Sequence, residues 1–407
     1  MAHREGADGG LGRAATTAAI VLSALVAPVV AGAESVAPRG IAPDEIVLGM
    51  TAPFSGSAKE LSRHWRTGWE LAFSLVNEQG GINGRRVRLV ALHDGNDPKK
   101  ALLVAKELLE KHRVFAMVGN VGTASTSSFL EHLLEEKVLL YCPLTGGKHV
   151  RSDPPDRYVF NCRTSYAEEV SAAVRYLVEV RRIKPSQMVI LTEANGYGEA
   201  GYKGFASQLR RYRRDPGAAV RVSYVPSATN IDEAVRVVRA NAKRLRAAVM
   251  VGHYRQVSKF IEKTRDLDLI YTSVSEVGAQ TLGDDLLQIG PRFTENLMVT
   301  EPGPLPTSHA SAVLKYQELL KKYAPSERPN FLSLQSYLAG LVFAEALKRA
   351  GRDLTTETVV DALEGLKGLD VGIGVPVGFS PSEHQAWHKV WGVTLLHDGS
   401  WKQVELE

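Results

Sequence analysis

Strand-like and helix-like runs alternate along the chain from Asp44 onward, and this alternation limits the fold more than any other feature. A first series of strand-like runs occupies residues 45–50, 86–93, 114–119, 138–142 and 157–162, and a second occupies residues 188–192, 219–225, 247–252 and 269–274. Strands that alternate with helices form parallel sheets covered by helices on both faces. The sequence therefore predicts an α/β protein with two doubly wound, parallel-sheet lobes. The length of 407 residues agrees with two lobes, because a chain of this length is too long to fold around one ordinary hydrophobic core.

Turn residues mark where these elements meet. In residues 77–90 (NEQGGINGRRVRLV), Gly80 or Gly81 suits the end of a helix at positive φ, and Asn83-Gly84 suits a tight reversal into the next strand. Residues 309–367 have a mostly helical pattern, and residues 389–406 predict two strands around an Asp-Gly turn.

The first 33 residues differ from the rest in their pattern. A polar start with Arg4 and Arg13 precedes a mostly apolar run at residues 14–30 and the small-residue pattern Ala31-Gly32-Ala33. This is the layout of a secretory signal peptide. A membrane anchor is the alternative, but the apolar run is short and no stop-transfer charges follow it. We expect export, with cleavage near Ala33–Glu34.

Composition excludes several classes of partner. Hydrophobic residues at 44% and charged residues at 23% are ordinary for a soluble globular protein. The net charge of +4 comes without the long Lys/Arg block that would indicate nucleic-acid binding, and the densest basic run, at residues 210–214, falls at the end of an expected helix. No second apolar run is long enough to span a bilayer. We expect a soluble mature chain with no nucleic-acid partner.

Motifs for catalysis and metal binding do not occur in the sequence. G-x-S-x-G, H-E-x-x-H and Cys-x-x-Cys are absent, and the eleven histidines show no metal-ligand spacing. Gly196, Gly198 and Gly201 follow a strand-like run, as in a dinucleotide-binding fingerprint, but the next strand ends in Pro226 and not in the acid that would hold a ribose. We therefore expect no enzyme, no cofactor and no metal site.

Residues 119–129 (GNVGTASTSSF) are a better candidate for ligand binding. Small hydroxyl residues at the start of a helix supply N-caps and leave backbone N–H groups that attract an anion such as a carboxylate. Plain capping without a ligand explains the segment equally well. The only cysteines, Cys142 and Cys162, could pair in an oxidising compartment or remain buried thiols.

Seven segments in order resemble the substrate-binding proteins of branched-chain amino acid ABC transporters: residues 47–56, 77–90, 93–101, 119–126, 142–146, 157–169 and 195–201. The resemblance covers nearly all of the mature chain. It implies a type I periplasmic binding protein, in which three crossover strands join two α/β lobes and a ligand lies in the cleft. Lobe 1 would hold residues 44–163 and 299–387, and lobe 2 would hold residues 164–298 and 388–407.

The resemblance also implies ligand contacts from lobe 1. Thr123 matches the residue that holds a ligand carboxylate, and Ser125 and Thr126 lie beside it in the same helix start. Thr145 and Gly146 match the next loop, whose hydroxyl and backbone groups complete the carboxylate site.

The implied contacts from lobe 2 are aromatic and acidic. Tyr197 and Tyr254 match aromatic residues of the cleft, and Glu276 matches the acid that receives an ammonium group. Glu168 falls near a second acidic position. Alternatives stay open for three of these residues, because the tyrosines could pack the lobe and Glu168 could be only a first-turn helix acid.

By this resemblance we expect a periplasmic, monomeric, solute-binding component of an ABC importer. It would capture an amino acid or related small carboxylate between two closing lobes, and a membrane permease would be its partner. The alternative keeps the fold but makes the protein a periplasmic sensor, or a binder of amides, urea or aromatic acids. Residues 54–65, which would meet the ligand side chain, differ from those of a typical leucine-binding protein, so the identity of the solute stays open.

Overall fold

Five parallel strands form the first sheet, in the order β2-β1-β3-β4-β5. They are β1 (Glu45–Ala52), β2 (Arg86–His93), β3 (Ala116–Val118), β4 (Leu140–Tyr141) and β5 (Val159–Phe160). Helices α2 (Pro98–Glu110) and α3 (Thr123–Glu135) cover one face, while α1 (Lys59–Glu78), α10 (Phe331–Ala350) and α11 (Thr356–Glu364) cover the other. Strand β1 shows why both faces are apolar: Ile46, Leu48 and Met50 pack toward α1, and Val47 packs toward α2.

The second sheet has seven strands, in the order β14-β13-β10-β9-β8-β6-β7. Five are parallel: β6 (Met188–Glu193), β7 (Val220–Tyr224), β8 (Ala247–Val251), β9 (Ile270–Val274) and β10 (Leu297–Glu301). The chain's last two strands, β13 (Trp391–Leu395) and β14 (Trp401–Val404), add to it in antiparallel fashion. Helices α4 (Tyr166–Arg175) and α5 (Gly196–Arg211) cover one face, and α6 (Asp232–Ala240), α7 (Tyr254–Thr264) and α8 (Ala279–Ile289) cover the other.

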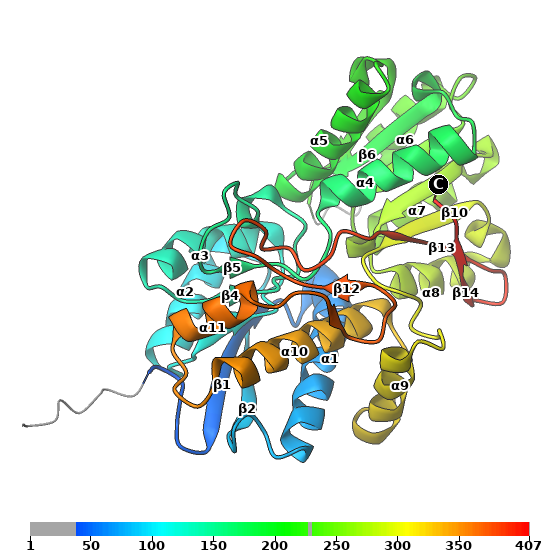
Figure 1. Cartoon of the computed structure of the whole chain (residues 1–407). Helices are drawn as coiled ribbons and strands as arrows, with labels where there is room; N and C mark the ends of the chain where they lie inside the picture. Colours follow the sequence, from blue (N-terminus) through cyan, green and yellow to red (C-terminus); the bar gives the residue numbers. More distant parts are fainter. Residues whose placement is uncertain (1–37, 227–229, 407) are drawn as a thin grey trace, which may run out of the picture. The chain divides into compact units, whose positions relative to one another are not determined.

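The remaining elements belong with the first sheet. Helix α10 packs along α1, and α9 (Ser311–Tyr323) packs against both (Figure 1). A short antiparallel pair, β11 (Leu369–Asp370) and β12 (Pro376–Val377), follows α11. The computed structural model describes residues 38–226 and 230–406, so the expected signal peptide at residues 1–33 lies outside the described part. Within that part, no helix combines the length and apolar character needed to cross a membrane.

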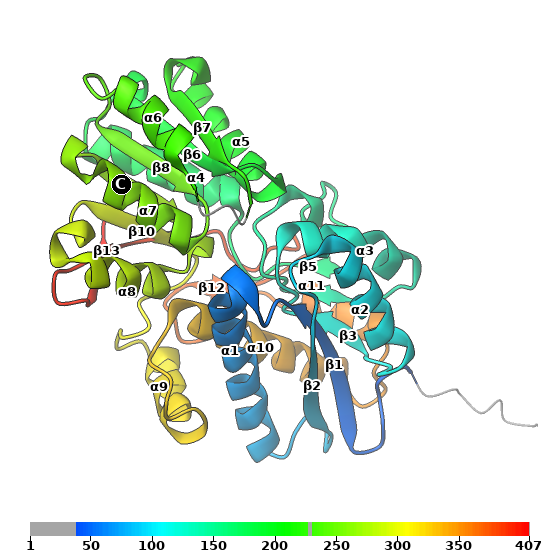
Figure 2. The same cartoon turned by 180° about the vertical axis from the view of Figure 1, so that it is seen from behind.

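The chain passes between the two sheets three times, at residues 161–165, 302–310 and 378–390. The first and third passages run side by side, since Asn161 pairs with Gln385 in a parallel bridge. The third passage is part of the orange-to-red segment that runs between the two sheets in Figures 1 and 2. The Asn161 N–H donates to the His384 carbonyl at 2.7 Å, and the Ala386 N–H donates to the Asn161 carbonyl at 2.8 Å. The predicted fold class, two parallel-sheet lobes joined by three crossings, is confirmed.

Several local predictions are also confirmed. Asn83 and Gly84 have φ values of 51° and 84°, as a tight reversal between α1 and β2 requires, and Gly80 and Gly81 also have positive φ. The tail forms the expected antiparallel pair, β13 and β14. Strands β3, β4 and β5 are shorter than predicted at both ends, and after β5 Asn161 pairs with Gln385 as a single bridge. Cys142 and Cys162 extend the neighbouring strands β4 and β5 and are both buried, free thiols.

Two of the three glycines in residues 196–201, Gly198 and Gly201, have a packing role. A Cβ on Gly198 would lie 1.9 Å from the Glu193 carbonyl oxygen, and a Cβ on Gly201 would lie 2.6 Å from the Val251 side chain. Helix α5 can therefore approach β6 and β8 only with glycine at these positions. These contacts account for Gly198 and Gly201.

Candidate functional site

The loops after β3 and β4 bring the predicted hydroxyl residues of the first lobe together. Thr123 is the first residue of α3, and its Oγ1 lies 2.8 Å from the Thr145 Oγ1. The Thr145 Oγ1 in turn accepts a hydrogen bond from the Gly147 N–H at 3.1 Å. These residues meet because β3 and β4 are adjacent and parallel, so their carboxyl ends share one edge of the sheet.

The start of α3 differs from the prediction in one respect. The N-cap is Gly122, at φ 101°, and not a serine or threonine, so the expectation that hydroxyl side chains cap this helix is wrong. The left-handed backbone of Gly122 lets the helix begin at Thr123 directly after the tight loop. Ser125 and Thr126 are buried in the first turn, and their hydroxyl oxygens have no hydrogen-bond partner among the described residues.

Gly146 brings the first lobe against the start of α4. Its carbonyl accepts a hydrogen bond from the Tyr166 N–H at 3.0 Å. A Cβ at this position would lie 2.5 Å from the Tyr166 nitrogen and 2.5 Å from its ring carbon Cδ1. Glycine is therefore required for this contact between the loop after β4 and α4.

Tyr166 connects the hydroxyl cluster with Glu276. Its fully buried phenol oxygen lies 3.3 Å from the Thr123 Oγ1, and its O–H donates to a carboxylate oxygen of Glu276. Burial and the facing Glu276 carboxylate raise the pKa of Tyr166, so the phenol stays protonated and acts as a donor. Glu276 follows β9 and is only 3% exposed.

Arg163, on the first passage between the sheets, provides the positive charge of this region. Its guanidinium donates to Glu169 at 3.0 Å and lies 3.7 Å from the Glu276 carboxylate. Burial alone would lower the pKa of Arg163, but the two carboxylates outweigh it and raise that pKa, so the side chain is charged. Burial raises the pKa of Glu276, although attraction by Arg163 opposes the shift.

The two predicted tyrosines occupy different surroundings. Tyr197, in the first turn of α5, is 2% exposed, and its ring centroid lies 4.7 Å from that of Tyr166 and 5.7 Å from that of His253. Its hydroxyl has no partner among the described residues. Tyr254 begins α7, packs on the core of the second lobe and accepts a hydrogen bond from the Arg255 Nε at 3.0 Å. Only Tyr197 therefore adjoins Tyr166.

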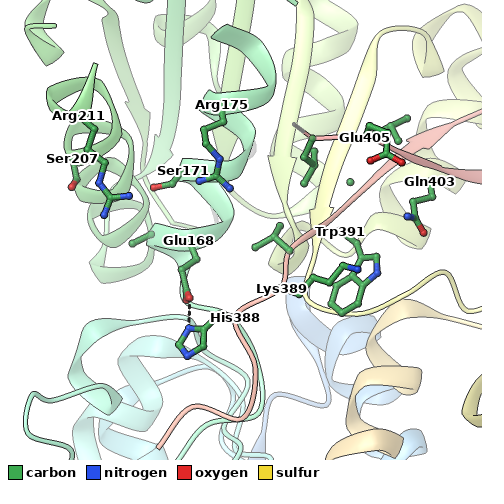
Figure 3. A pocket seen from close by; sticks show the side chains of 15 residues that line it. Glu168, Ser171, Arg175, Ser207, Arg211, His388, Lys389, Trp391, Gln403 and Glu405 are labelled. Carbon is green, nitrogen blue, oxygen red and sulfur yellow. Dashed lines mark hydrogen bonds and ion pairs between the residues drawn. The ribbon is translucent and has the colours of Figure 1, made fainter. Parts of the chain in front are cut away.

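Glu168 points away from this group, toward the third passage between the sheets. It forms an ion pair with His388 at 2.6 Å (Figure 3). It also forms a capping box with Ser165 at the start of α4 and accepts a hydrogen bond from Gln385 at 3.0 Å. Burial opposes its ionisation, but the bonds from His388, Ser165 and Gln385 outweigh burial and lower the pKa of Glu168 to about 2. The carboxylate thus joins α4 to the chain at residue 388.

Of the cavities that adjoin these residues, two border helix α5. One, of about 580 Å³, is lined by Thr123, Gly146 and Gly147 from the first lobe and by Ser165, Gly196 and Lys203 from the second, among others. The other, of about 640 Å³, lies beside the Glu168–His388 pair, between α4, α5 and the tail (Figure 3). In the described ranges, no group of three or more His, Cys, Asp or Glu side chains could hold a metal ion.

The structure thus brings Thr123, Thr145 and Gly146 together and connects them to Glu276 and Tyr197 through Tyr166. Sequence reasoning missed Arg163, Tyr166 and Glu169. The signal that could have found them is the segment Arg163–Glu169, in which polar residues directly follow the carboxyl end of a buried strand.

Comparisons with known proteins agree with this architecture. The chain is 23% identical to the leucine-, isoleucine-, valine-, threonine- and alanine-binding protein of Pseudomonas aeruginosa, over 79% of this chain and 83% of that protein. It is 22% identical to the Leu/Ile/Val-binding protein of Escherichia coli K12, over 81% and 90% of the two chains.

Solved structures show the same fold. A possible leucine/isoleucine/valine-binding protein from Rhodopirellula baltica superposes with a TM-score of 0.84 at 27% identity, covering 92% of this chain and 99% of that one. The branched-chain amino acid transporter substrate-binding protein of Streptococcus pneumoniae, in complex with isoleucine, has a TM-score of 0.74 at 18% identity, covering 89% and 99%. The model of the periplasmic binding protein family matches residues 45–400, and the chain therefore belongs to that family.

Proposed function

We propose that this protein is the periplasmic solute-binding component of an ABC importer, and that it captures an amino acid or related small carboxylate between its two lobes. Membership of the periplasmic binding protein family supports the solute-binding role. The relatives from Pseudomonas and Escherichia are named as binding proteins for leucine, isoleucine and valine, which supports a ligand of this size and charge. The importer's membrane permease would be the macromolecular partner.

The observation that carries the proposal is the connection between Thr123 and Glu276. The hydroxyls of Thr123 and Thr145 offer hydrogen bonds to a carboxylate, and the Ser125 and Thr126 hydroxyls beside them are unpartnered among the described residues. Through Tyr166, this cluster adjoins an acid and an aromatic residue of the second lobe. A hydrogen bond to a charged group contributes about 1.5–3 kcal/mol, so a few such bonds are enough for a small ligand.

We expect the two lobes to close on the ligand, because each lobe supplies some of its contacts. Groups from both lobes would touch one ligand, and all contacts would form only when the lobes come together. The ligand would then shift the population toward the closed form. We propose residues 44–163 with 299–387, and residues 164–298 with 388–407, as the two moving bodies.

The proposed role requires export. The signal-peptide pattern of residues 1–33 supports transfer to the periplasm with cleavage near Ala33–Glu34. The mass of the protein recovered from a periplasmic fraction tests this point, because cleavage makes Glu34 the first residue. Retention of the full-length mass would contradict it.

The function itself is tested by a thermal-shift screen of the mature chain against amino acids, amides and aromatic or aliphatic carboxylates, followed by calorimetry on each hit. A ligand that binds only the folded state raises the melting temperature, by an amount that grows with its concentration above Kd. We expect saturable binding of one class of small solute, recovered unchanged after incubation. No binding by any member, or conversion of the bound compound into a product, would contradict the proposal.

A further inference from the structure

Tyr166 lies between Thr123 and Glu276, where the body of a bound amino acid would lie. An α-amino acid would put its carboxylate at Thr123 and its ammonium group at Glu276. In this chain the Tyr166 phenol lies 3.3 Å from the Thr123 Oγ1 and donates its proton to Glu276. The two positions are therefore already joined by a side chain of the protein.

The surroundings of Glu276 strengthen this observation. Besides the Tyr166 donor, the Arg163 guanidinium lies 3.7 Å from its carboxylate. The Tyr166 ring is wholly buried and is packed against Tyr197 and the loop at Gly146. An incoming ammonium group would have to displace a buried tyrosine and then lie beside a buried cation.

The cavity of about 580 Å³ offers a different place for a ligand. Thr123 and Gly146 line it, together with small residues of both lobes such as Gly147, Ser165 and Gly204. Its volume lies within the range of about 300–1,000 Å³ that is usual for small-molecule sites. Glu276 and Tyr197 do not line it.

The charged groups around this cavity favour an anion. Lys148 and Arg151 line it from the loop after β4, and Lys203 lines it from α5. The only carboxylate among its lining residues, Glu199, is paired with Arg221 at 2.6 Å. Lys148 and Lys203 form no ion pair with a carboxylate in the described part of the chain, whereas Arg151 donates to neutral oxygens such as the Thr145 carbonyl at 3.0 Å. His149 adds no charge, because burial lowers its pKa to about 4.

We propose that this cavity binds a small organic carboxylate that has no ammonium group, held between Lys148 of one lobe and Lys203 of the other, and that Tyr166 excludes α-amino acids by occupying the ammonium position. The inference rests on the proposed function, since it names the ligand class of the same cleft. It also supplies a physical link for closure, because one anion would attract a cation from each lobe.

Matched ligand pairs test the proposal on the mature chain by isothermal titration calorimetry. The pairs are 4-methylpentanoate with L-leucine and 3-phenylpropanoate with L-phenylalanine, which differ only in the ammonium group. In at least one pair, we expect the deaminated acid to bind at least about tenfold more tightly than the amino acid. A tenfold loss of affinity is what one misplaced charged group in the amino acid would cause. If the amino acid binds as tightly or more tightly, and Glu276→Gln weakens it, the inference is overturned while the proposed function stands. If no member of either pair and no other solute binds, both fail.

Variants separate the roles of the charged residues and Tyr166. Lys148→Gln and Lys203→Gln should each weaken binding of the acid by about threefold to tenfold, because each removes one charge whose attraction solvent partly screens, since both lysines are exposed. Lys321→Gln, on the exposed side of α9, is the matched control and should leave the affinity unchanged. Tyr166→Ala should raise the affinity for the amino acid of the pair. Equal affinities in the Lys203 and Lys321 variants would overturn the proposal, even if the Tyr166 variant does not fold.

Discussion

The guanidinium of Arg163 donates a hydrogen bond to the carboxylate of Glu169 across 3.0 Å, and both side chains are buried. The other carboxylate oxygen of Glu169 accepts from the Ser275 N–H at 2.8 Å and from the Thr300 hydroxyl at 3.2 Å. This one acid therefore joins the first passage between the sheets to the ends of β9 and β10, beside Glu276. The pair fixes the backbone from which Tyr166 and Glu276 extend.

Removing Glu169 should destabilise the protein strongly. Glu169→Ala leaves a buried guanidinium without its main partner, which typically costs about 3–5 kcal/mol of unfolding free energy. Urea unfolding of the mature chain measures the change. Glu70→Ala is the control, because its pair with Arg66 is exposed and should cost no more than about 1 kcal/mol. A loss for Glu169→Ala as small as that of the control would contradict the role given to this pair.

The Glu168–His388 pair should make stability depend on pH. Glu168 has a folded pKa of about 2, below the ordinary 4.5, so its contribution is complete above pH 4.5 and is lost as the pH falls toward 2. Glu168 holds the pKa of His388 above its ordinary 6.5, so that contribution is complete below pH 6.5 and is lost as the pH rises through the folded pKa. The pair therefore stabilises the protein most between pH 4.5 and 6.5.

His388→Gln is the variant that tests this dependence. Wild type should exceed the variant in unfolding free energy at about pH 5.5, and the gap should shrink at about pH 9. Because the His388 side chain is 56% exposed, solvent screens the pair and the gap should stay below about 1 kcal/mol. If the difference in unfolding free energy between wild type and variant is the same at both pH values, the Glu168–His388 pair does not cause the pH dependence.

Gly146 should tolerate no side chain. Gly146→Ala places a Cβ 2.5 Å from the backbone nitrogen of Tyr166, and moving α4 to relieve the contact should cost about 1–3 kcal/mol. Gly196→Ala is the matched control in the same cavity wall, since the nearest atom to its Cβ would be the Thr123 Cγ2 at 3.9 Å, and its stability should change by less than about 0.5 kcal/mol. Chemical unfolding compares the two variants. Equal stability of the two variants would contradict the prediction, because it would mean that the loop after β4 can move to accept a Cβ at no cost in free energy.

The fold was predictable from the sequence because the spacing of hydrophobic residues and the turn residues determine secondary structure within short segments of the chain. The alternation of strands and helices predicted both parallel sheets, and the Asp-Gly turn predicted the pairing of β13 with β14. The five-residue π-helical turn at Tyr176–Val180, which continues α4, gave no local signal.

The sequence pattern alone indicated the segment at residues 119–129, and the family resemblance supplied the other candidate residues. Thr123 and Thr145 meet because they follow the ends of adjacent strands. The Arg163–Glu169 pair lies within the polar segment that follows β5, so its position at the end of a buried strand could have indicated it. The contact of Tyr166 with Glu276 joins residues that are 110 positions apart, and no spacing in the sequence indicates it. The cap at Gly122 was missed because a glycine supplies it through its backbone.

Small-angle X-ray scattering tests the central claim, that the two lobes close on a small solute, most directly. The mature chain would be measured alone and with a saturating concentration of a solute whose binding calorimetry has established. The account predicts a smaller radius of gyration in the bound sample, reversed when the solute is removed by dialysis. Superimposable scattering curves for the free and the saturated protein would contradict it.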